Sequence, residues 1–271
     1  MRSAVTICLV PEARQGPFVF HEGLDAGCRA AVELGFDGVE IFPESAAGFE
    51  GSGLAHCLAT HGLTLAAVGS GAGWVKHKLH LCHPEPTVRA QAVSFVGDLV
   101  DRAGELGAPV IVGSMQGRSE GAMAREQAIP LLVEALHVLG DRAARHGQVL
   151  LYEPLNRYET NLFNHQADAA ECIKAHGLTT VKLLCDLFHM NIEEADIPAA
   201  LIACGDLVGH IHWADSNRQA IGFGHTTVEP IVGALAQIGY HGYLSAEVFP
   251  FPTSLAAARQ SVESFRTFTK G

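Results

Sequence analysis

Short apolar segments alternate with longer amphipathic stretches along this sequence. The amphipathic stretches have the periodicity of helices, as in residues 122–147, and several end at a glycine just before the next apolar segment. The apolar segments are typical of buried β-strands, and eight of them occur, at residues 4–10, 38–42, 63–68, 109–113, 148–153, 180–186, 207–213 and 243–249. The pattern therefore predicts eight consecutive βα units.

Eight βα units in a chain of 271 residues predict the α/β class and, within it, a (β/α)8 TIM barrel. The main competitor is a doubly wound sheet, which would place a G-x-G-x-x-G turn after its first strand. Here the first strand runs into PEARQGPF, at residues 11–18, which lacks that turn. The sequence has no linker or low-complexity segment, so we expect residues 1–271 to form a single barrel domain.

Composition argues against several classes of protein. The net charge of −11, from 18 Lys and Arg against 29 Asp and Glu, disfavours a nucleic-acid partner and an anionic membrane surface. The seven cysteines are scattered and form no C-x-x-C pair, which indicates neither a disulfide framework nor a zinc knuckle. The N-terminal apolar run is too short for a signal peptide. We therefore expect a soluble, cytoplasmic protein.

Side chains that can bind a metal lie where four consecutive predicted strands end. Glu153 and Asp186 end the fifth and sixth strands, and His212 and Glu247 lie near the ends of the seventh and eighth. The carboxyl ends of barrel strands meet on one face, where the active sites of such enzymes lie. One polar strand end is usually just solvated, but four in succession predict a shared site.

Three carboxylates and one imidazole predict a site for a hard divalent cation. Mn²⁺, Mg²⁺ or Co²⁺ suits such ligands better than a structural zinc ion does. The ion would leave positions open for two adjacent substrate oxygens and would stabilise an enediolate. Glu153 and Glu247 belong to strands that are three apart in the ring, so we expect them to face each other across the substrate as proton-transfer groups.

The same part of the sequence resembles a known family. The segments EPLNRYET (153–160), CDLFHMNIEE (185–194), HIHWADSNR (210–218) and AEVF (246–249) are similar to motifs of the ketose 3-epimerases and related keto-sugar-acid epimerases of the xylose-isomerase-like TIM barrel superfamily. The resemblance is strong over residues 148–250 and weak before them. It implies a sugar epimerase that inverts C3 of a 2-keto sugar or keto-sugar acid through a cis-enediolate, with Mn²⁺ as the preferred ion.

Carried over residue by residue, the resemblance assigns the four strand-end side chains as metal ligands. It also implies that Glu153 and Glu247 are the acid/base pair, and that Glu159, His189 and Arg218 hold substrate oxygens. These three side chains lie within the matching motifs. For Glu159 and Arg218, a simple ion pair between loops is the competing interpretation.

Two further residues complete the predicted site. Arg118 follows the fourth strand, in a loop that also contains Gln116, and an arginine there can pair with the carboxylate or phosphate of a sugar derivative. An ordinary surface arginine is the alternative. The loop at residues 69–86 is long enough to predict a lid, and within it Trp74 is predicted to pack on the sugar.

Other functions remain open or are disfavoured. An aldose–ketose isomerase of the hydroxypyruvate or sugar-phosphate type would use the same ligands and the same enediolate. DNA-repair endonucleases of the superfamily carry further histidine ligands after the third and fourth strands, where this chain has Gly69–Ser70 and Gly113–Ser114. Histidines on predicted helices, such as His61, are interpreted as exposed. A homo-oligomer, dimer or tetramer, is left open.

Overall fold

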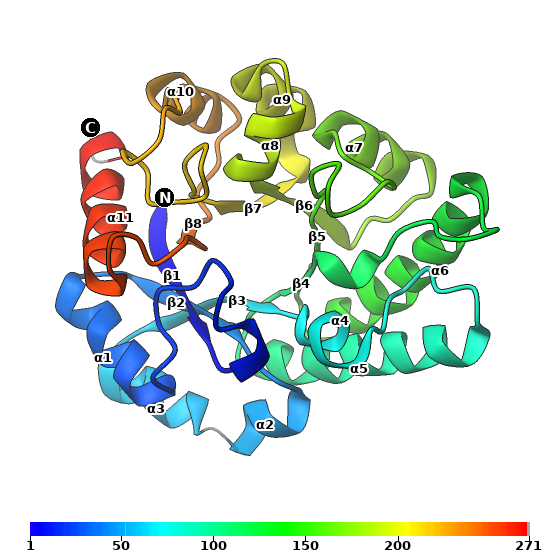
Figure 1. Cartoon of the computed structure of the whole chain (residues 1–271), viewed down its shortest axis with the longest axis horizontal. Helices are drawn as coiled ribbons and strands as arrows, with labels where there is room; N and C mark the ends of the chain where they lie inside the picture. Colours follow the sequence, from blue (N-terminus) through cyan, green and yellow to red (C-terminus); the bar gives the residue numbers. More distant parts are fainter. Residues whose placement is uncertain (52, 270–271) are drawn as a thin grey trace.

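The computed structural model describes residues 1–51 and 53–269, and these form a closed barrel of eight parallel strands in sequence order (Figure 1). The strands are β1 (Arg2–Cys8), β2 (Gly38–Phe42), β3 (Thr64–Gly69), β4 (Val110–Val112), β5 (Leu150–Tyr152), β6 (Val181–Asp186), β7 (Val208–His212) and β8 (Tyr243–Ala246). The predicted (β/α)8 fold is confirmed. The predicted domain also includes residues 52, 270 and 271, which lie outside the described part of the chain.

Helices form an outer ring around the barrel, and α11 lies beside α1 where the ring closes (Figure 1). The helices are α1 (Leu24–Leu34), α2 (Ala46–Gly51), α3 (Leu54–His61), α4 (Ala72–His77), α5 (Pro86–Glu105), α6 (Arg125–Ala144), α7 (Gln166–Ala175), α8 (Leu187–Glu193), α9 (Ile197–Cys204), α10 (Glu229–Gln237) and α11 (Ser254–Thr269), with short 3₁₀ turns at Pro11–Ala13, Ser114–Gln116 and Gly205–Leu207. Among the described residues, none of these helices is both long and apolar enough to cross a membrane.

Glycines end helices as the sequence predicts. Gly35 and Gly62 follow α1 and α3 with φ angles of 87° and 65°, and the N–H of each donates to carbonyls of the last helical turn. Only glycine adopts this left-handed conformation without steric cost, so the chain can turn from each helix directly into the next strand.

The eighth strand is shorter than predicted. It ends at Ala246 rather than at residue 249. There the backbone turns, so that the N–H of Glu247 donates to the carbonyl of Ser245, and the N–H of Phe249 donates to the carbonyl of Arg218 in the preceding loop. The turn leaves Glu247 just beyond the strand, at the carboxyl end of the barrel.

Among the described residues, the hydrophobic core consists of one large cluster and three small ones. The large cluster fills the space between the strands and the outer helices, where each fully buried Leu or Ile contributes roughly 1.5–3 kcal/mol. A smaller cluster fills the inside of the barrel and consists of Ala67, Ile111, Leu151 and Leu184 from four neighbouring strands. Ile111 of this cluster also lines the cavity at the carboxyl end of the barrel.

Candidate active site

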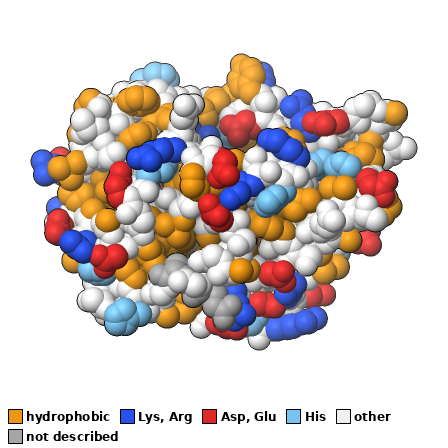
Figure 2. Space-filling model, turned by 60° about the horizontal axis from the view of Figure 1, so that its bottom comes forward, with side chains coloured by type: hydrophobic (Ala, Val, Ile, Leu, Met, Phe, Trp, Pro, Cys, Tyr) orange, Lys and Arg blue, Asp and Glu red, His pale blue; other side chains and the backbone are white. Residues whose placement is uncertain are grey.

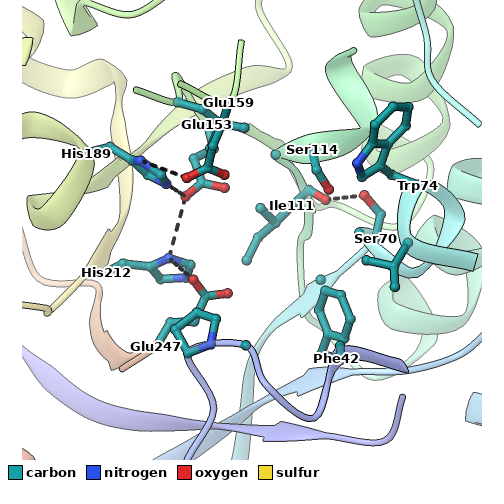
Figure 3. A pocket seen from close by; sticks show the side chains of 18 of the residues that line it. Phe42, Ser70, Trp74, Ile111, Ser114, Glu153, Glu159, His189, His212 and Glu247 are labelled. Atoms are coloured by element: carbon teal, nitrogen blue, oxygen red, sulfur yellow. Dashed lines mark hydrogen bonds and ion pairs between the residues drawn. The ribbon is translucent and has the colours of Figure 1, made fainter. Parts of the chain in front are cut away.

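The four predicted metal ligands meet at the carboxyl end of the barrel. Glu153 and Glu247 directly follow β5 and β8, whereas Asp186 and His212 are the last residues of β6 and β7. Three of them, Glu153, His212 and Glu247, line a cavity of about 480 Å³, and Figure 3 shows Glu153 and Glu247 on opposite sides of His212. The predicted convergence of these side chains is therefore seen in the structure.

His212 lies at the centre of the group. Its Nδ1 atom is 3.6 Å from Oε1 of Glu153, 3.5 Å from Oδ2 of Asp186 and 3.7 Å from Oε2 of Glu247. One ligand atom from each of Glu153, Asp186 and His212 lies within 4.8 Å of the other two. Glu247 joins this trio through its contact with His212.

Three buried polar atoms of these residues have no hydrogen-bond partner, and this indicates whether the residues could bind a cation. Oε1 of Glu153, Oδ2 of Asp186 and Nδ1 of His212 are all buried and have no hydrogen-bond partner. Leaving buried polar groups unpaired costs about 1–3 kcal/mol each, and more for charged groups, so a native protein normally satisfies them. The three unpaired atoms point to one another, and two carboxylates with an imidazole are a donor set for a divalent cation. The residues present fit the ion.

Glu40 on β2 fixes the orientation of the His212 ring. Its carboxylate is fully buried and accepts hydrogen bonds from Nε2 of His212 at 3.3 Å, from Nε2 of His210 at 3.0 Å and from the Thr6 hydroxyl at 3.0 Å. The charges of the two imidazoles hold the pKa of Glu40 well below its usual range despite its burial. Because an ionised carboxylate only accepts, Nε2 of His212 must carry a proton, and Nδ1 faces the three carboxylates.

Sequence reasoning missed Glu40. The signal was present, because a glutamate inside the apolar strand GVEIF is unusual for a strand buried on both faces. Its partners, however, come from β1 and β7. β1 pairs directly with β2, but only the barrel brings β7 near it.

The buried carboxyl groups have different pKa values. Burial is the main reason that the pKa values of Glu153 and Glu247 are raised, and the negative charge of Asp186 adds to the effect. Burial also opposes ionisation of Asp186, but the imidazoles of His189 and His212 hold its pKa below the usual range. The site therefore combines one carboxylate that stays ionised with two carboxyl groups that hold protons readily.

His189 and Glu159 both line the cavity, and Asn156, which was not predicted, connects them. Nδ1 of His189 accepts a hydrogen bond from the side-chain amide of Asn156 at 2.7 Å, and the same amide donates to Oε1 of Glu159 at 3.0 Å. The proton of the His189 ring is thus on Nε2, which is buried, unpaired and 3.7 Å from Oδ2 of Asp186. It is available as a donor to a substrate oxygen.

Arg218 also lies in the cavity. Its Nη2 atom donates to Oε2 of Glu247 at 2.6 Å and is 3.7 Å from Oδ2 of Asp186, while Nη1 is 3.7 Å from Oε1 of Glu159. Its backbone has a φ of 59°, a conformation that is strained for a residue with a side chain. The surrounding loop holds it there, since the Asp215 carboxylate accepts hydrogen bonds from backbone N–H groups of Ser216, Gly222, Gly224 and Thr226.

The opposite wall of the cavity is apolar and open. Phe18, Phe42 and Trp74 line it together with Ser70 and Ser114 (Figure 3 labels all but Phe18). The aromatic wall therefore comes from the β1 and β2 ends and from α4, rather than from the loop after β4.

Glycine at position 113 makes room for the Glu153 carboxylate. A Cβ atom at Gly113 would lie 2.3 Å from Oε2 of Glu153, which no real contact allows. The predicted Gly–Ser ends of β3 and β4 therefore provide space rather than ligands.

In the loop after β4, Arg118 faces the cavity whereas Gln116 is buried in the core. Arg118 lines the cavity, with its Nε 3.7 Å from Oε1 of Glu120. Gln116 does not contribute to the cavity surface. It is fully buried, where its amide donates to the backbone carbonyl of Glu153 at 2.8 Å and its oxygen accepts from the Tyr152 hydroxyl at 2.7 Å. Gln116 thus supports Glu153 from below.

The segment predicted as a lid is partly anchored. Leu81 and Cys82 are buried, and the N–H of Leu81 donates to the carbonyl of Met115. Helix α4, in the same segment, is held at the surface by ion pairs from Lys76 to Glu12 and Glu44. Movement of this segment stays a prediction, and α4 is the part that these weaker contacts would allow to move.

Figure 2 shows acidic and basic side chains interspersed over one face of the molecule. That face carries no broad basic patch of the kind that binds a phosphate backbone.

Known proteins match both the sequence and the fold. A family model for the xylose isomerase-like TIM barrel matches residues 28–268. The D-psicose 3-epimerase of Ruminiclostridium cellulolyticum is 29% identical over 253 residues, covering 89% of this chain and 82% of that protein. The L-ribulose 3-epimerase of Mesorhizobium japonicum is 31% identical over 222 residues, covering 80% and 72%.

Among solved structures, that of 3-keto-D-glucoside 4-epimerase from E. coli matches with a TM-score of 0.82 at 24% identity, covering 98% of this chain and all of that one. This likeness concerns the fold. With the sequence matches, it shows that the chain belongs to the xylose isomerase-like TIM barrel family, groups there with the ketose 3-epimerases, and is an enzyme of the isomerase class.

Proposed function

We propose that this enzyme is a divalent-metal-dependent epimerase that inverts C3 of a 2-keto sugar or keto-sugar acid. The observation that carries the proposal is the buried group of Glu153, Asp186 and His212, whose unpaired atoms face one another beside Glu247. A site that only bound a sugar would not need several buried acidic groups without partners.

Glu153, Asp186, His212 and Glu247 would hold the ion, with Mn²⁺ as the preferred species and Mg²⁺ or Co²⁺ as alternatives. When bound, the ion supplies Lewis-acid stabilisation of the negative charge that develops on the substrate oxygens. Asp186, whose pKa is held low, is suited to permanent ligation. Glu40 accepts a hydrogen bond from Nε2–H of His212, which would leave the Nδ1 lone pair free to bind the ion.

Glu153 and Glu247 would move the protons. They stand on opposite sides of His212, so one carboxylate removes the C3 proton from one face of the substrate (Figure 3). The other carboxyl group returns a proton to the opposite face of the resulting cis-enediolate. Inversion at C3 requires this arrangement, because a single group would return the proton to the face from which it came.

His189, Glu159 and Arg218 would hold the substrate in place. Nε2 of His189 offers a buried donor, and Arg218 offers guanidinium N–H groups next to Glu247. Trp74 and Arg118 line the far side of the cavity, where the rest of the sugar would lie. Arg118 is the group in position to pair with a carboxylate or phosphate on that end.

Isotope exchange in D₂O tests the proposal. The purified enzyme, with its metal content measured, is incubated with ketohexoses, ketopentoses and keto-sugar acids in separate reactions. We expect solvent deuterium at C3 of the epimeric product and none at C1. Deuterium at C1 together with an aldose product would overturn the epimerase assignment in favour of an aldose–ketose isomerase, which uses the same site.

A further inference from the structure

A second group of side chains that can bind a metal lies in the outer ring of helices, away from the cavity. It spans α1 and α3, which pack side by side (Figure 1). Asp25 and Cys28 are three residues apart on α1, and Cys57 and His61 are four apart on α3. Such spacings place each pair on one helix face, so two ligand pairs meet where the helices touch.

Three of the four side chains are already close together. One ligand atom from each of Asp25, Cys57 and His61 lies within 4.8 Å of the other two, and Nε2 of His61 is 3.1 Å from Oδ1 of Asp25. Cys28 is one helical turn from Asp25 on α1, and burial together with the neighbouring Cys57 thiol raises its pKa. Ligand atoms around a tetrahedral zinc ion are roughly 3.3–3.8 Å apart, which is near the spacing of the first three. Cys28 would complete the four by rotating its thiol toward Cys57.

Burial of the group follows a gradient from the core to solvent. Cys28 is fully buried and Cys57 is 7% exposed, whereas the side chains of His61 and Asp25 are 16% and 66% exposed. An ion could therefore enter past the Asp25 carboxylate and end against the two thiols. The interpretation of His61 as an exposed histidine is wrong, since its ring packs against α1 and is paired with Asp25.

We propose that Asp25, Cys28, Cys57 and His61 form a second cation site, specific for a thiophilic divalent ion such as Zn²⁺. On binding, each thiol would lose its proton to solvent, leaving two thiolates, one imidazole and one carboxylate around the ion. Those ligands select zinc, whereas the oxygen-rich group at the barrel end suits Mn²⁺ or Mg²⁺. The ion would tie α1 to α3 on the outside of the barrel. This site does not depend on the proposed function.

Cobalt spectroscopy tests the site on the full-length enzyme. Co²⁺ titrated under reducing conditions should bind with two equivalents and produce the near-ultraviolet thiolate-to-cobalt charge-transfer band, which an oxygen and nitrogen centre lacks. Cys57→Ser should abolish the band and lower the number of bound Co²⁺ equivalents by one, whether or not the barrel end binds an ion of its own. Cys204→Ser, which alters a buried thiol outside the group, should keep the band.

Two outcomes would overturn the proposal. The first is one equivalent of Co²⁺ with no thiolate band in the unaltered enzyme. The second is a band that persists in Cys57→Ser. If Cys57→Ser does not fold, Asp25→Asn and His61→Gln alter the more exposed ligands instead. Both should weaken Zn²⁺ binding about tenfold or more in competition with a chelating dye, and unchanged affinity in both would equally contradict the site.

Discussion

The two halves of the barrel contribute different things to one cavity. The ends of β5 to β8 bring carboxylates and an imidazole to within hydrogen-bonding or ion-binding range of one another. The ends of β2 to β4 bring Phe42 and the Gly–Ser pairs at residues 69–70 and 113–114, which shape the space opposite. The second half thus holds the groups that we propose to react, and the first half shapes the space against them.

This division matters because the two tasks tolerate change differently. Groups that share an ion or move a proton must keep their positions within about 0.5 Å, so each is fixed by neighbours, as Glu153 is by Gln116. A wall that only contacts the substrate can vary in size and polarity without disabling the chemistry. We therefore expect variants of the second half to lose turnover, and variants of the first half to change substrate binding.

The largest effect is expected from Asp186→Asn. The change removes a ligand charge but keeps the helix cap, because the side-chain oxygen can still accept the N–H of Phe188. We expect metal affinity to fall by more than about 100-fold, beyond the loss of 10- to 100-fold typical of an outer partner, and turnover to fall with it. Isothermal titration with Mn²⁺ and assays at saturating metal measure the two losses.

Asp206→Asn is the matched control, since Asp206 is exposed and far from the cavity in a 3₁₀ turn. It should leave both quantities unchanged. If Asp186→Asn bound Mn²⁺ as tightly as the unaltered enzyme, the strand ends of the second half would not be a metal site. Circular dichroism should show the same folded content for both variants.

The barrel and the convergence of its strand-end ligands could be predicted because both are periodic in sequence. Each βα unit repeats an apolar strand, a polar strand end and a helix, and the barrel fold then fixes where all the strand ends point. Glu153, Asp186, His212 and Glu247 follow from that rule alone. His189 and Glu159 also lie in the cavity, but their assignment rested on the family resemblance.

Residues whose role depends on packing between distant strands could not be predicted. Glu40 lies inside a strand, and its role is visible only when β2 lies across the barrel from His210 and His212. Gln116 seemed to belong to an active-site loop, yet the backbone turn at Ser114–Gln116 directs its side chain into the core. Neither position has a periodic signal, because neither follows from secondary structure.

Glu40→Gln examines the carboxylate of the first half that is hydrogen-bonded to His212, one of the proposed metal ligands. The amide keeps the size of the side chain but cannot accept from His210 and His212 as a carboxylate does. We expect the affinity for Mn²⁺ to fall by about 10- to 100-fold, as for other partners of a ligand histidine, with turnover largely recovered at saturating metal. Titration calorimetry and nitrogen NMR of the His212 ring measure this.

Glu134→Gln, on the exposed face of α6, is the matched control and should change neither the affinity nor the ring signal. An unaltered Mn²⁺ affinity in Glu40→Gln would mean that Glu40 does not influence metal binding through His212. A turnover that stays low at saturating Mn²⁺ would instead place Glu40 in the chemistry itself.

The smallest effect is expected from Trp74→Ala, which tests the first half as a binding wall. The Trp74 side chain lines the cavity, and its ring meets that of His80 edge-on at 5.9 Å. Loss of an aromatic contact of about 0.5–1.5 kcal/mol corresponds to a rise in KM of roughly two- to twelvefold, with kcat nearly constant. Steady-state kinetics on the substrate identified by isotope exchange measure both constants. Leu79→Ala, which removes a partly buried core contact outside the cavity, controls for a general loss of packing and should not raise KM.

The separate changes in KM and kcat of Trp74→Ala distinguish two roles for α4, a fixed wall and a closing lid. A contact that is equally strong in the ground state and in the transition state raises KM alone when it is lost. If α4 instead closes over the substrate to exclude water from the enediolate, removing Trp74 would lower kcat as well, because fewer bound complexes would reach the closed form. The ion pairs from Lys76 to Glu12 and Glu44 would then be the contacts that change on closing. A fall in kcat with KM unchanged would therefore end the division between a reacting half and a shaping half, since a residue of the first half would be needed for the reaction itself.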